Sequence, residues 1–389
     1  MRKIKKILII KGAAQYGVLR YVCDELMCAF CEFGCITSML DLSHTSYNDI
    51  DFSHLEQNDM IFSFDVIGID IYRMMNHKPF FWTFLVDPPF YLHERLLQLD
   101  GNVMVSCIDR NHVNYIDTYY KNIPWVCFMP HGGIVSEPLS FIPYLKRLYG
   151  ISFLSSIGNI NAINSVIDSI KYEYSSFAKE IIEMILDDIN LPLENAVQSN
   201  LKAYNIPFNS SEFTELMFHF RAMDALRRYY KRLSLVKSLI NQGITVNIWG
   251  NGWEETELAN KKYSDLVVLH GNTVYTSVNN IMHNSEIVLC DMPFFYDGSH
   301  ERIFASMQSG AITVTDKSKY LSEVFSDNDN IIFYKTDNIK LLASRIRVLQ
   351  NDVGKAQNII DNAIEASHQH TWRNRAISIL EISENIITL

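Results

Sequence analysis

A short polar loop, Asp297–Gly298–Ser299–His300, stands directly before a helical pattern that begins near Glu301. The start of a helix carries backbone N–H groups without intrahelical partners and the positive end of the helix dipole. A phosphate group binds well at such a place, and Gly298 would allow the backbone to approach it closely. The loop therefore predicts a phosphate site. The alternative is an ordinary helix start capped by Asp297 or Ser299.

Three more polar residues each follow a predicted strand in the first third of the chain: Asp87 after Phe80–Val86, Asp109 after Val103–Ile108, and His131 after Trp125–Met129. Ligands of parallel sheets bind beyond the carboxyl ends of the strands. These side chains are therefore candidates for chemistry. Each aspartate could instead cap a helix, and His131 with its two following glycines could form a backbone turn.

A loop of small residues, Lys11–Ala14, follows the first predicted strand, and its Gly12 would let a substrate come close. The loop lacks both GxGxxG and GxxxxGK[ST], so it is not a dinucleotide or ATP loop.

Four cysteines, Cys23, Cys28, Cys31 and Cys35, resemble a plant-type ferredoxin run in part of their spacing. They fall on a predicted helix that leads into a strand, without a glycine-rich cluster loop. Small apolar helix residues explain them better, and we expect no metal there.

Residues 1–145 alternate short apolar runs with helical patterns. The predicted strands are Lys6–Ile10, Cys35–Leu40, Asp59–Ser63, Phe80–Val86, Val103–Ile108 and Trp125–Met129. They are rich in Ile, Val and Phe and lack polar alternation, which is typical of parallel strands buried on both faces. The pattern predicts an N-terminal, doubly wound Rossmann-like domain.

Residues 146–371 repeat this organisation after a stretch rich in Pro and Gly. The predicted strands are Ile151–Ser155, Thr245–Trp249, Leu266–Leu269, Glu286–Cys290, Ala311–Thr315 and Ile331–Tyr334. A helical insertion over about 160–242 separates the first two, and its long last helix, Ser211–Gln242, ends before Gly243, a typical C-cap glycine. Residues 372–389 form a final helix. Two such domains facing each other would share one cleft.

Charge and hydropathy narrow the functional classes. The chain has 389 residues with 34 Lys+Arg and 44 Asp+Glu, a net charge of −10, which disfavours nucleic acid as a partner. No run approaches the ~20 apolar residues of a membrane span. The basic start is followed by four apolar residues, fewer than the roughly 7–15 of a signal peptide. Seven cysteines fit a reducing compartment. We expect a cytoplasmic protein without a transmembrane segment; transient membrane association stays open.

Three segments of the second half together resemble a known family. GSHERIF with the following SMQSGA and VTD, VNIWGNGW (Val246–Trp253) and LHGNTVY (Leu269–Tyr275) are similar in order and spacing to family-1-type glycosyltransferases, particularly the CgeB-like (spore-maturation-protein-like) group. The motifs cover about Thr245–Phe325, and FLVDPPF and FMPHGG are more weakly similar. The resemblance implies a GT-B fold: two Rossmann-like domains, with the nucleotide-sugar donor mainly on the second and a C-terminal helix that crosses back to the first.

The resemblance also implies donor-binding roles for residues of both domains. They are Gly12 near the donor sugar, Arg232 at the diphosphate, Gly250, Asn251 and Gly252 at the base with Trp249 or Trp253 nearby, and the Asp297–Arg302 segment (Asp297, Gly298, Ser299, His300, Glu301 and Arg302). A guanidinium suits a diphosphate. Core packing is the other explanation for the tryptophans. For most of the other cations on the same helix, Arg221, Arg227, Arg228, Lys231 and Lys237, we expect a solvated charged face.

One departure concerns a glutamate pair. Related retaining enzymes carry two glutamates separated by seven residues, and the second usually holds the donor ribose. Asp297 and Ala305 occupy these positions here. Glu301 could substitute for the second, because residues i and i+4 share a helix face.

The stereochemistry of transfer stays open. An inverting transferase needs a general base for the acceptor hydroxyl, and Asp87, Asp109 and His131 are the candidates. A retaining enzyme instead needs stabilisation of the leaving group. The triplets Asp49–Asp51 and Asp327–Asp329 match the DxD motif that holds a metal in the other common glycosyltransferase fold, but a GT-B enzyme does not need it.

We therefore expect a metal-independent, hexosyltransferase-like GT-B enzyme without a cofactor. It would move a sugar from a nucleotide-diphosphate sugar, with UDP-sugar first among the donors, to a hydroxyl of a glycan, lipid-linked or protein acceptor. Bacterial cell-surface glycan assembly is the setting that the family suggests. Two alternatives are a non-catalytic GT-B-like module that binds a nucleotide or a partner, and a nucleotide-sugar epimerase on the same fold.

Overall fold

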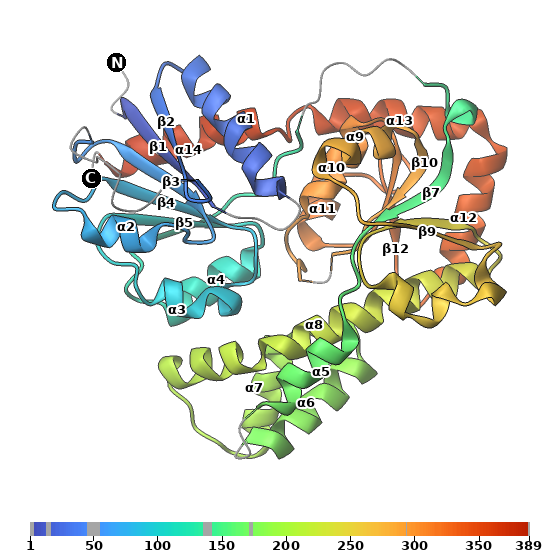
Figure 1. Cartoon of the computed structure of the whole chain (residues 1–389), viewed down its shortest axis with the longest axis horizontal. Coiled ribbons are helices and arrows are strands. Elements are labelled where there is room, and N and C mark those ends of the chain that lie inside the picture. Colours follow the sequence, from blue (N-terminus) through green and yellow to red (C-terminus); the bar gives the residue numbers. More distant parts are fainter. Residues whose placement is uncertain are drawn as a thin grey trace. The chain divides into compact units, whose positions relative to one another are not determined.

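The computed structural model describes residues 4–12, 17–44, 55–134, 142–170, 174–292 and 294–387. The chain divides into two compact units (Figure 1). The first unit contains Met1–Val135, Asp297–Ala305 and Ser367–Leu389, and the second contains Ser136–Tyr296 and Ser306–Ala366. The segment that carries the predicted phosphate loop thus belongs to the first unit, although the chain on both sides of it belongs to the second.

The first unit is built on a parallel sheet with the strand order β2-β1-β3-β4-β5-β6. The strands are β1 (Lys6–Lys11), β2 (Ile36–Asp41), β3 (Met60–Phe64), β4 (Phe80–Leu85), β5 (Val103–Cys107) and β6 (Trp125–Phe128). Every residue of β3, β4 and β5 is buried, which explains their unbroken apolar sequence.

Helices accompany this sheet along the chain: α1 (Val18–Glu32), α2 (Ile69–Met74), the 3₁₀ turn η3 (Pro89–Leu92), α3 (His93–Leu96), α4 (Arg110–Tyr119) and α14 (Trp372–Ile386). The C-terminal helix α14 packs against α1. Its first residue, Trp372, is fully buried and lies edge-on to Phe64 and Phe84 of the sheet. The end of the chain is therefore part of the core of the first unit.

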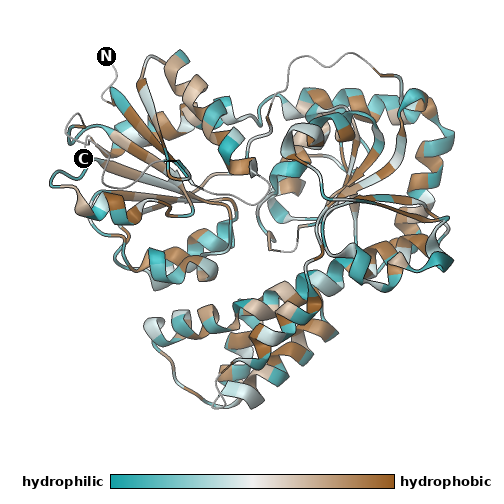
Figure 2. Cartoon of the chain, in the orientation of Figure 1, coloured by the Kyte–Doolittle hydropathy of each residue, from teal (hydrophilic) through white to brown (hydrophobic). Residues whose placement is uncertain are grey.

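The second unit has its own parallel sheet with the order β12-β11-β10-β7-β8-β9. The strands are β7 (Tyr149–Leu154), β8 (Val246–Trp249), β9 (Val267–Gly271), β10 (Ser285–Leu289), β11 (Ile312–Asp316) and β12 (Ile332–Tyr334). Figure 2 shows the apolar residues gathered along the central strands of each sheet.

Four helices form the insertion between β7 and β8: α5 (Ile160–Asp168), α6 (Ser175–Asp187), α7 (Leu193–Ala203) and α8 (Ser210–Ile240). The long helix α8 begins at a capping box formed by Asn209 and Glu212. It contacts α5, α6 and α7, and also α12 and β8 (Figure 1). The same helix therefore belongs to the insertion and to the body of the second unit.

The remaining elements follow β8. They are the 3₁₀ turns η6 (Trp253–Glu255), η7 (Glu257–Ala259) and η8 (Lys261–Tyr263) and the helices α9 (Tyr275–His283), α10 (Glu301–Gln308), α11 (Lys319–Val324), α12 (Ile339–Asn351) and α13 (Val353–Ser367). A further 3₁₀ turn, η4 (Tyr144–Lys146), precedes β7.

The predicted α/β class is confirmed, and each predicted strand is present. The largest differences are of two residues, as where β7 starts at Tyr149 rather than at Ile151. Helix α8 stops at Ile240, shortly before Gly243, whose φ of +73° is the left-handed conformation expected after a helix end. None of the described helices is long and apolar enough to cross a membrane.

The four cysteines and the DxD triplets resemble metal sites only in the sequence. Cys23 and Cys35 are buried, whereas Cys28 and Cys31 are exposed. Asp327 accepts the amide of Phe333 and pairs with Arg345, and Asp49–Asp51 lies outside the described residues. In the part of the chain that the structure describes, no group of three or more His, Cys, Asp or Glu is arranged to hold a metal ion.

Candidate functional site

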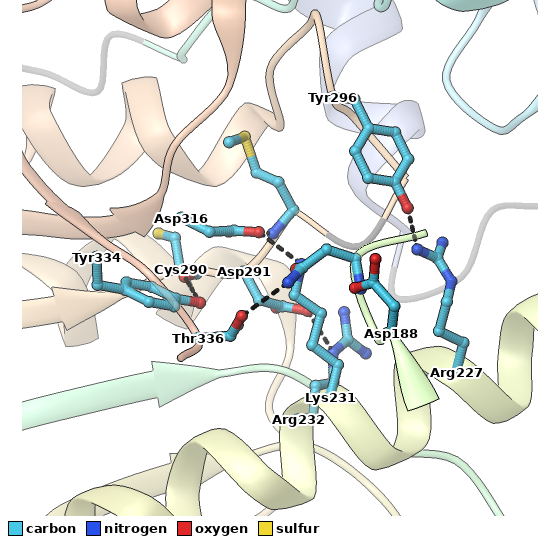
Figure 3. A network of polar contacts seen from close by, with 12 residues as sticks. Asp188, Arg227, Lys231, Arg232, Cys290, Asp291, Tyr296, Asp316, Tyr334 and Thr336 are labelled. Carbon is cyan, nitrogen blue, oxygen red and sulfur yellow. Dashed lines mark hydrogen bonds and ion pairs between the residues drawn. The ribbon is translucent and has the colours of Figure 1, made fainter. Parts of the chain in front are cut away.

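A network of buried charges lies where β10 and β11 of the second unit end (Figure 3). Nε of Arg232, on α8, lies 2.7 Å from a carboxylate oxygen of Asp291, two residues beyond β10. The other oxygen of Asp291 accepts the Ser155 hydroxyl at 3.3 Å, and Arg232 also donates to the carbonyl of Ser156. Arg232 is thus held by groups that follow two neighbouring strands, β7 and β10.

The neighbouring cation on α8 is held in the same way. Nζ of Lys231 lies 2.7 Å from Asp316, the last residue of β11, and only 3% of the Lys231 surface is exposed. The second oxygen of Asp316 accepts the amide of Met292 at 2.7 Å. A buried ammonium group without a partner would be very costly, so Asp316 fixes both the charge and the position of Lys231.

A third buried cation of α8 is Arg227, which is 1% exposed. Its guanidinium pairs with Asp224 and donates to the hydroxyl of Tyr296. Burial alone would lower the pKa of Arg227, but the carboxylate and the phenol together raise it. Burial raises the pKa of Tyr296 as well. Arg227 therefore stays charged and anchors the residue that directly precedes the Asp297 loop.

The expectation of a solvated charged face on α8 is wrong for Arg227 and Lys231. Both are buried because carboxylates meet them, namely Asp224 one helical turn away and Asp316 from β11. The expectation fits Lys237, whose side chain is partly exposed and pairs with a partly exposed Glu257 at 2.6 Å.

The Gly250–Asn251–Gly252 turn packs its main chain against the segment after β7. The amide of Asn251 donates to Ser156 Oγ at 2.9 Å. A Cβ atom on Gly250 (φ +145°) would lie 2.5 Å from the Ser155 carbonyl oxygen, and one on Gly252 (φ +89°) 2.5 Å from that of Gly158. Both glycines are therefore required by left-handed backbone and by close approach.

The two tryptophans that flank this turn have different surroundings. Trp253 is fully buried in the core and donates to the Ser155 carbonyl at 2.6 Å. This is the core-packing alternative. Trp249 is buried on β8, and its indole stacks on the exposed His270 ring with centroids 4.0 Å apart and an interplanar angle of 2°.

In the first unit, the Asp297 loop docks onto the end of β5 through Asp109. One carboxylate oxygen of Asp109 accepts the amide of Asn111 and caps α4, and the other accepts the amide of Asp297 at 2.8 Å. Arg110 pairs with Asp297 at 3.1 Å. A Cβ atom on Gly298 would collide with the Ile108 carbonyl and the Asp109 backbone, so no larger residue fits there.

The predicted phosphate loop continues with Ser299 and His300 and leads into helix α10 at Glu301. Ser299 is fully buried, and its hydroxyl has no hydrogen-bond partner among the described residues. The His300 ring lies 6.1 Å from the His131 ring, and its Nδ1 accepts the amide of Arg302 at 3.2 Å. Helix α10 begins at Glu301, as predicted, and Glu301 itself is buried.

His131 is clamped by the start of α14. Arg375 donates to the carbonyls of Pro130 at 2.8 Å and of His131 at 3.0 Å. A Cβ atom on Gly132 would collide with the backbone of Trp372. Burial, and next the charge of Arg375, lower the pKa of His131 to about 3. The imidazole is therefore neutral and a weak base.

Asp87 and Gly12 lie in other loops of the first unit. Asp87 is exposed, and its backbone amide lies 3.4 Å from the Asp65 carboxylate. A Cβ atom on Gly12 would lie 2.8 Å from the Ile67 side chain. Ala13 and Ala14 lie outside the described residues.

The structure thus brings the predicted residues together in two groups, one in each unit. Asp109, His131, Asp297, Gly298, Ser299 and His300 form one group, and Arg232, Gly250 and Asn251 form the other. Sequence reasoning missed Asp291 and Asp316. Both stand at the ends of strands, so the rule that selected Asp87 and Asp109 could have found them.

Comparisons with known proteins agree with this architecture. The profile of a family described as glycosyl transferase-like matches residues 227–381. No curated protein matches the sequence closely enough to count as a relative. Sucrose-phosphate synthase from Thermosynechococcus elongatus has a similar structure, with a TM-score of 0.56 and 10% identity, over 99% of both chains. The DNA-modifying enzyme β-glucosyltransferase, solved with and without uridine diphosphoglucose, is also similar, with a TM-score of 0.56 and 12% sequence identity. The match covers 99% of this chain and 100% of the β-glucosyltransferase chain.

The structure of TarM is also similar, with a TM-score of 0.49, 14% identity and 85% of this chain covered. The chain spans about half of TarM, 55% of its length. At these identities the structural likeness concerns the fold. The whole chain therefore has the GT-B fold of these glycosyltransferases, and residues 227–381 carry a glycosyl transferase-like sequence.

Proposed function

We propose that the chain is a glycosyltransferase that transfers a sugar from a nucleotide-diphosphate sugar, with a UDP-sugar as the first donor to test. The observation that carries the proposal is the position of the family match. It starts at Arg227 and includes Lys231, Arg232 and the Gly250–Gly252 turn of the second unit. The buried cations Arg227, Lys231 and Arg232 thus lie within the glycosyl transferase-like sequence.

The network suits a leaving diphosphate. Charge develops on the diphosphate as the glycosidic bond breaks, and fixed cations stabilise such charge best when their positions are set beforehand. Asp291 and Asp316 hold Arg232 and Lys231 in place before any ligand arrives. Each of these cations is paired with a carboxylate, so the network has little net charge before the donor binds. The negative charge of the diphosphate would then be met by hydrogen bonds from the cations.

The finer features belong to the same proposal. We propose a hexosyl donor, a hydroxyl acceptor on a glycan, lipid-linked or protein substrate, catalysis without a metal and a CgeB-like relationship. Cell-surface glycan assembly in the cytoplasm is the corresponding setting. One structural neighbour, the DNA-modifying β-glucosyltransferase, has uridine diphosphoglucose as its substrate, which is why a UDP-sugar comes first.

Ala305 favours a second candidate, a GT-B-like module that binds a nucleotide or a partner without turnover. Ala305 is a buried residue of helix α10, and related retaining enzymes carry a glutamate at its position. A nucleotide-sugar epimerase is a third possibility on the same fold, and it would convert the donor without any acceptor.

A thermal-shift screen against UDP, GDP, dTDP, CMP and their sugars tests the proposal. Ligand at ~100-fold excess over its Kd adds ~2.7 kcal/mol to the stability of the folded state. One nucleotide that raises the Tm, and whose sugar is released or transferred, supports a transferase. Binding with no chemical change to donor or acceptor favours the module, and epimerised donor favours the epimerase.

A further inference from the structure

Two leucines at the entrance to the second sheet stand out into the solvent. Leu145 lies in the 3₁₀ turn η4 and is 63% exposed, and Leu148 directly precedes β7 and is 72% exposed. Tyr144, the first residue of the same turn, is buried in the core of the second unit and holds the turn in place. A single exposed leucine needs no explanation, but a contiguous apolar patch marks an interaction surface.

The apolar surface extends over the face of β8 and β9 that points away from the core. Ile248 and Val267 pack into the core of the second unit. Because side chains alternate along a strand, Trp249 of β8 and Val268 and His270 of β9 lie on the opposite face. Val268 is 39% exposed, and His270 is exposed as well. Strand β9 is also the edge of its sheet.

Tyr149 joins the leucines to this face. It follows Leu148 directly, and the centroid of its ring lies 4.9 Å from that of Trp249 and 5.9 Å from that of His270. Trp249 is buried under the His270 ring, on which it stacks. The three rings give the exposed side chains a firm support. We call the exposed residues around them the Leu145 surface: Leu145, Lys146, Leu148, Val268 and His270.

The exposed charge of the Leu145 surface is positive. Lys146 and Arg147 stand between the two leucines, and neither the segment 143–149 nor the strands β8 and β9 contain Asp or Glu. Arg147 is half-buried, donates to the Ser285 carbonyl at 2.9 Å and interacts with the half-buried carboxylate of Glu286. Arg147 and Glu286 offset each other, so the exposed Lys146 provides the charge of the surface.

We propose that the Leu145 surface docks on a lipid bilayer with anionic headgroups. Leucine side chains can enter the acyl boundary, and aromatic rings favour the level of the headgroups. A lysine between them can lay its apolar stem along the surface and keep its ammonium group among the headgroup phosphates. Leu145 and Leu148, with Lys146 between them and the rings behind, combine these features.

The docking is weak and reversible. Two leucines and one exposed lysine bury far less apolar surface than a lipid anchor does, and the net charge of −10 of the chain opposes the attraction to anionic lipid. Binding should therefore increase with the share of anionic lipid and decrease with salt. The inference goes beyond the proposed function and does not depend on it. Among the proposed acceptors, it favours the lipid-linked class.

Sedimentation with vesicles measures the docking. The probes are vesicles of phosphatidylcholine alone and of phosphatidylcholine with phosphatidylglycerol. We expect the parent chain to sediment with the second kind and much less with the first. Leu145→Ser/Leu148→Ser should bind at least about tenfold more weakly, because two apolar side chains no longer leave water. Lys146→Gln should bind more weakly and depend less on salt.

Leu341→Ser/Val348→Ser is the matched control. Leu341 and Val348 are 54% and 47% exposed, and they lie two helical turns apart on α12 in the same unit. This variant should bind vesicles like the parent. Exposed substitutions change folding little, and melting curves of both double variants check this. Hydrogen exchange should slow in peptides that cover residues 143–149 and 267–271 when anionic vesicles are added, and stay unchanged in α12.

Each contrary result overturns the inference in its own way. A parent chain that stays in solution with anionic vesicles has no such docking surface. Equal binding of the parent and Leu145→Ser/Leu148→Ser places the contact elsewhere, and equal binding to both kinds of vesicle removes the role of anionic lipid. Light scattering that shows a dimer in the parent and a monomer in Leu145→Ser/Leu148→Ser assigns the surface to a second copy of the chain. A failure of the proposed function appears separately, as absent nucleotide binding without vesicles.

Discussion

Arg232 and Asp291 form a buried ion pair, with 2.7 Å between Nε and the carboxylate, that joins the middle of α8 to the end of β10. The pair connects the helix of the insertion with the edge of the sheet at which parallel folds bind their ligands. The two residues are 59 positions apart in the sequence, so the position of one does not predict the other as its partner.

Arg232→Met should destabilise the second unit strongly. The substitution leaves the Asp291 carboxylate buried without its cation, which costs about 3–5 kcal/mol. Lys237→Met, on the same helix, removes an exposed pair with Glu257 and should cost no more than about 1 kcal/mol. Urea unfolding of both variants measures the difference. Equal losses would mean that Arg232 and Asp291 interact no more strongly than a surface pair.

Gly252→Ala should lower the Tm more than Gly271→Ala. Both glycines have a positive φ, +89° and +70°, so alanine is strained at either place. A Cβ atom on Gly252 would also lie 2.5 Å from the Gly158 carbonyl oxygen, whereas one on Gly271 meets nothing within 4 Å. Calorimetric melting of the two variants isolates this close approach. A similar Tm for both would show that the turn has room to give way.

Arg375→Met should raise the pKa of His131. Burial is the main reason for its low pKa of about 3, and the charge of Arg375 is the second. NMR titration of histidine-labelled protein should find a His131 resonance that titrates at higher pH in the variant. Arg373→Met provides the control, because Arg373 is an exposed residue of the same helix that pairs with Glu32. A His131 pKa that Arg375→Met leaves unchanged would rule out the electrostatic effect.

Asp65 should make the protein less stable as the pH rises from about 4 to about 8. Its pKa in the folded state, about 8, lies above the ordinary value of 3.8, so the unfolded chain loses its proton first. Over this window the folded state binds more protons than the unfolded chain, so its stability falls as the pH rises. Denaturation of the parent and of Asp65→Asn at the two ends of the window should give stability curves that diverge. Parallel curves would contradict the raised pKa.

The sheets were predictable because their strands are continuous apolar runs. A run such as Phe80–Leu85 can be buried on both faces in a parallel sheet and suits few other structures. The start of α10 at Glu301 was predictable for a similar local reason, since DGSH is a typical polar stretch before a helix.

The ion pairs of the charge network were not predictable, because the two partners of Lys231–Asp316 and of Arg232–Asp291 are distant in the sequence. Lys231 looks like a solvated residue of a charged helix until β11 brings Asp316 against it. The docking of the Asp297 loop on Asp109 joins residues 188 positions apart. The turn after β3 has positive φ angles at Asp65 and Val66 but contains no glycine at these positions that would indicate such a turn. Hydrogen bonds with β4 and α3 impose the conformation instead.

The most direct test of the central claim is a calorimetric titration of UDP into the parent chain, Arg232→Lys and Lys237→Met. Lysine keeps a cation beside Asp291 but loses the planar fork that suits a diphosphate. If the second unit holds the donor, the parent and Lys237→Met bind UDP alike. Arg232→Lys then binds at least about tenfold more weakly, a difference of about 1.4 kcal/mol. Equal affinity in all three proteins, or no binding of UDP or any other nucleotide to the parent, would contradict the account.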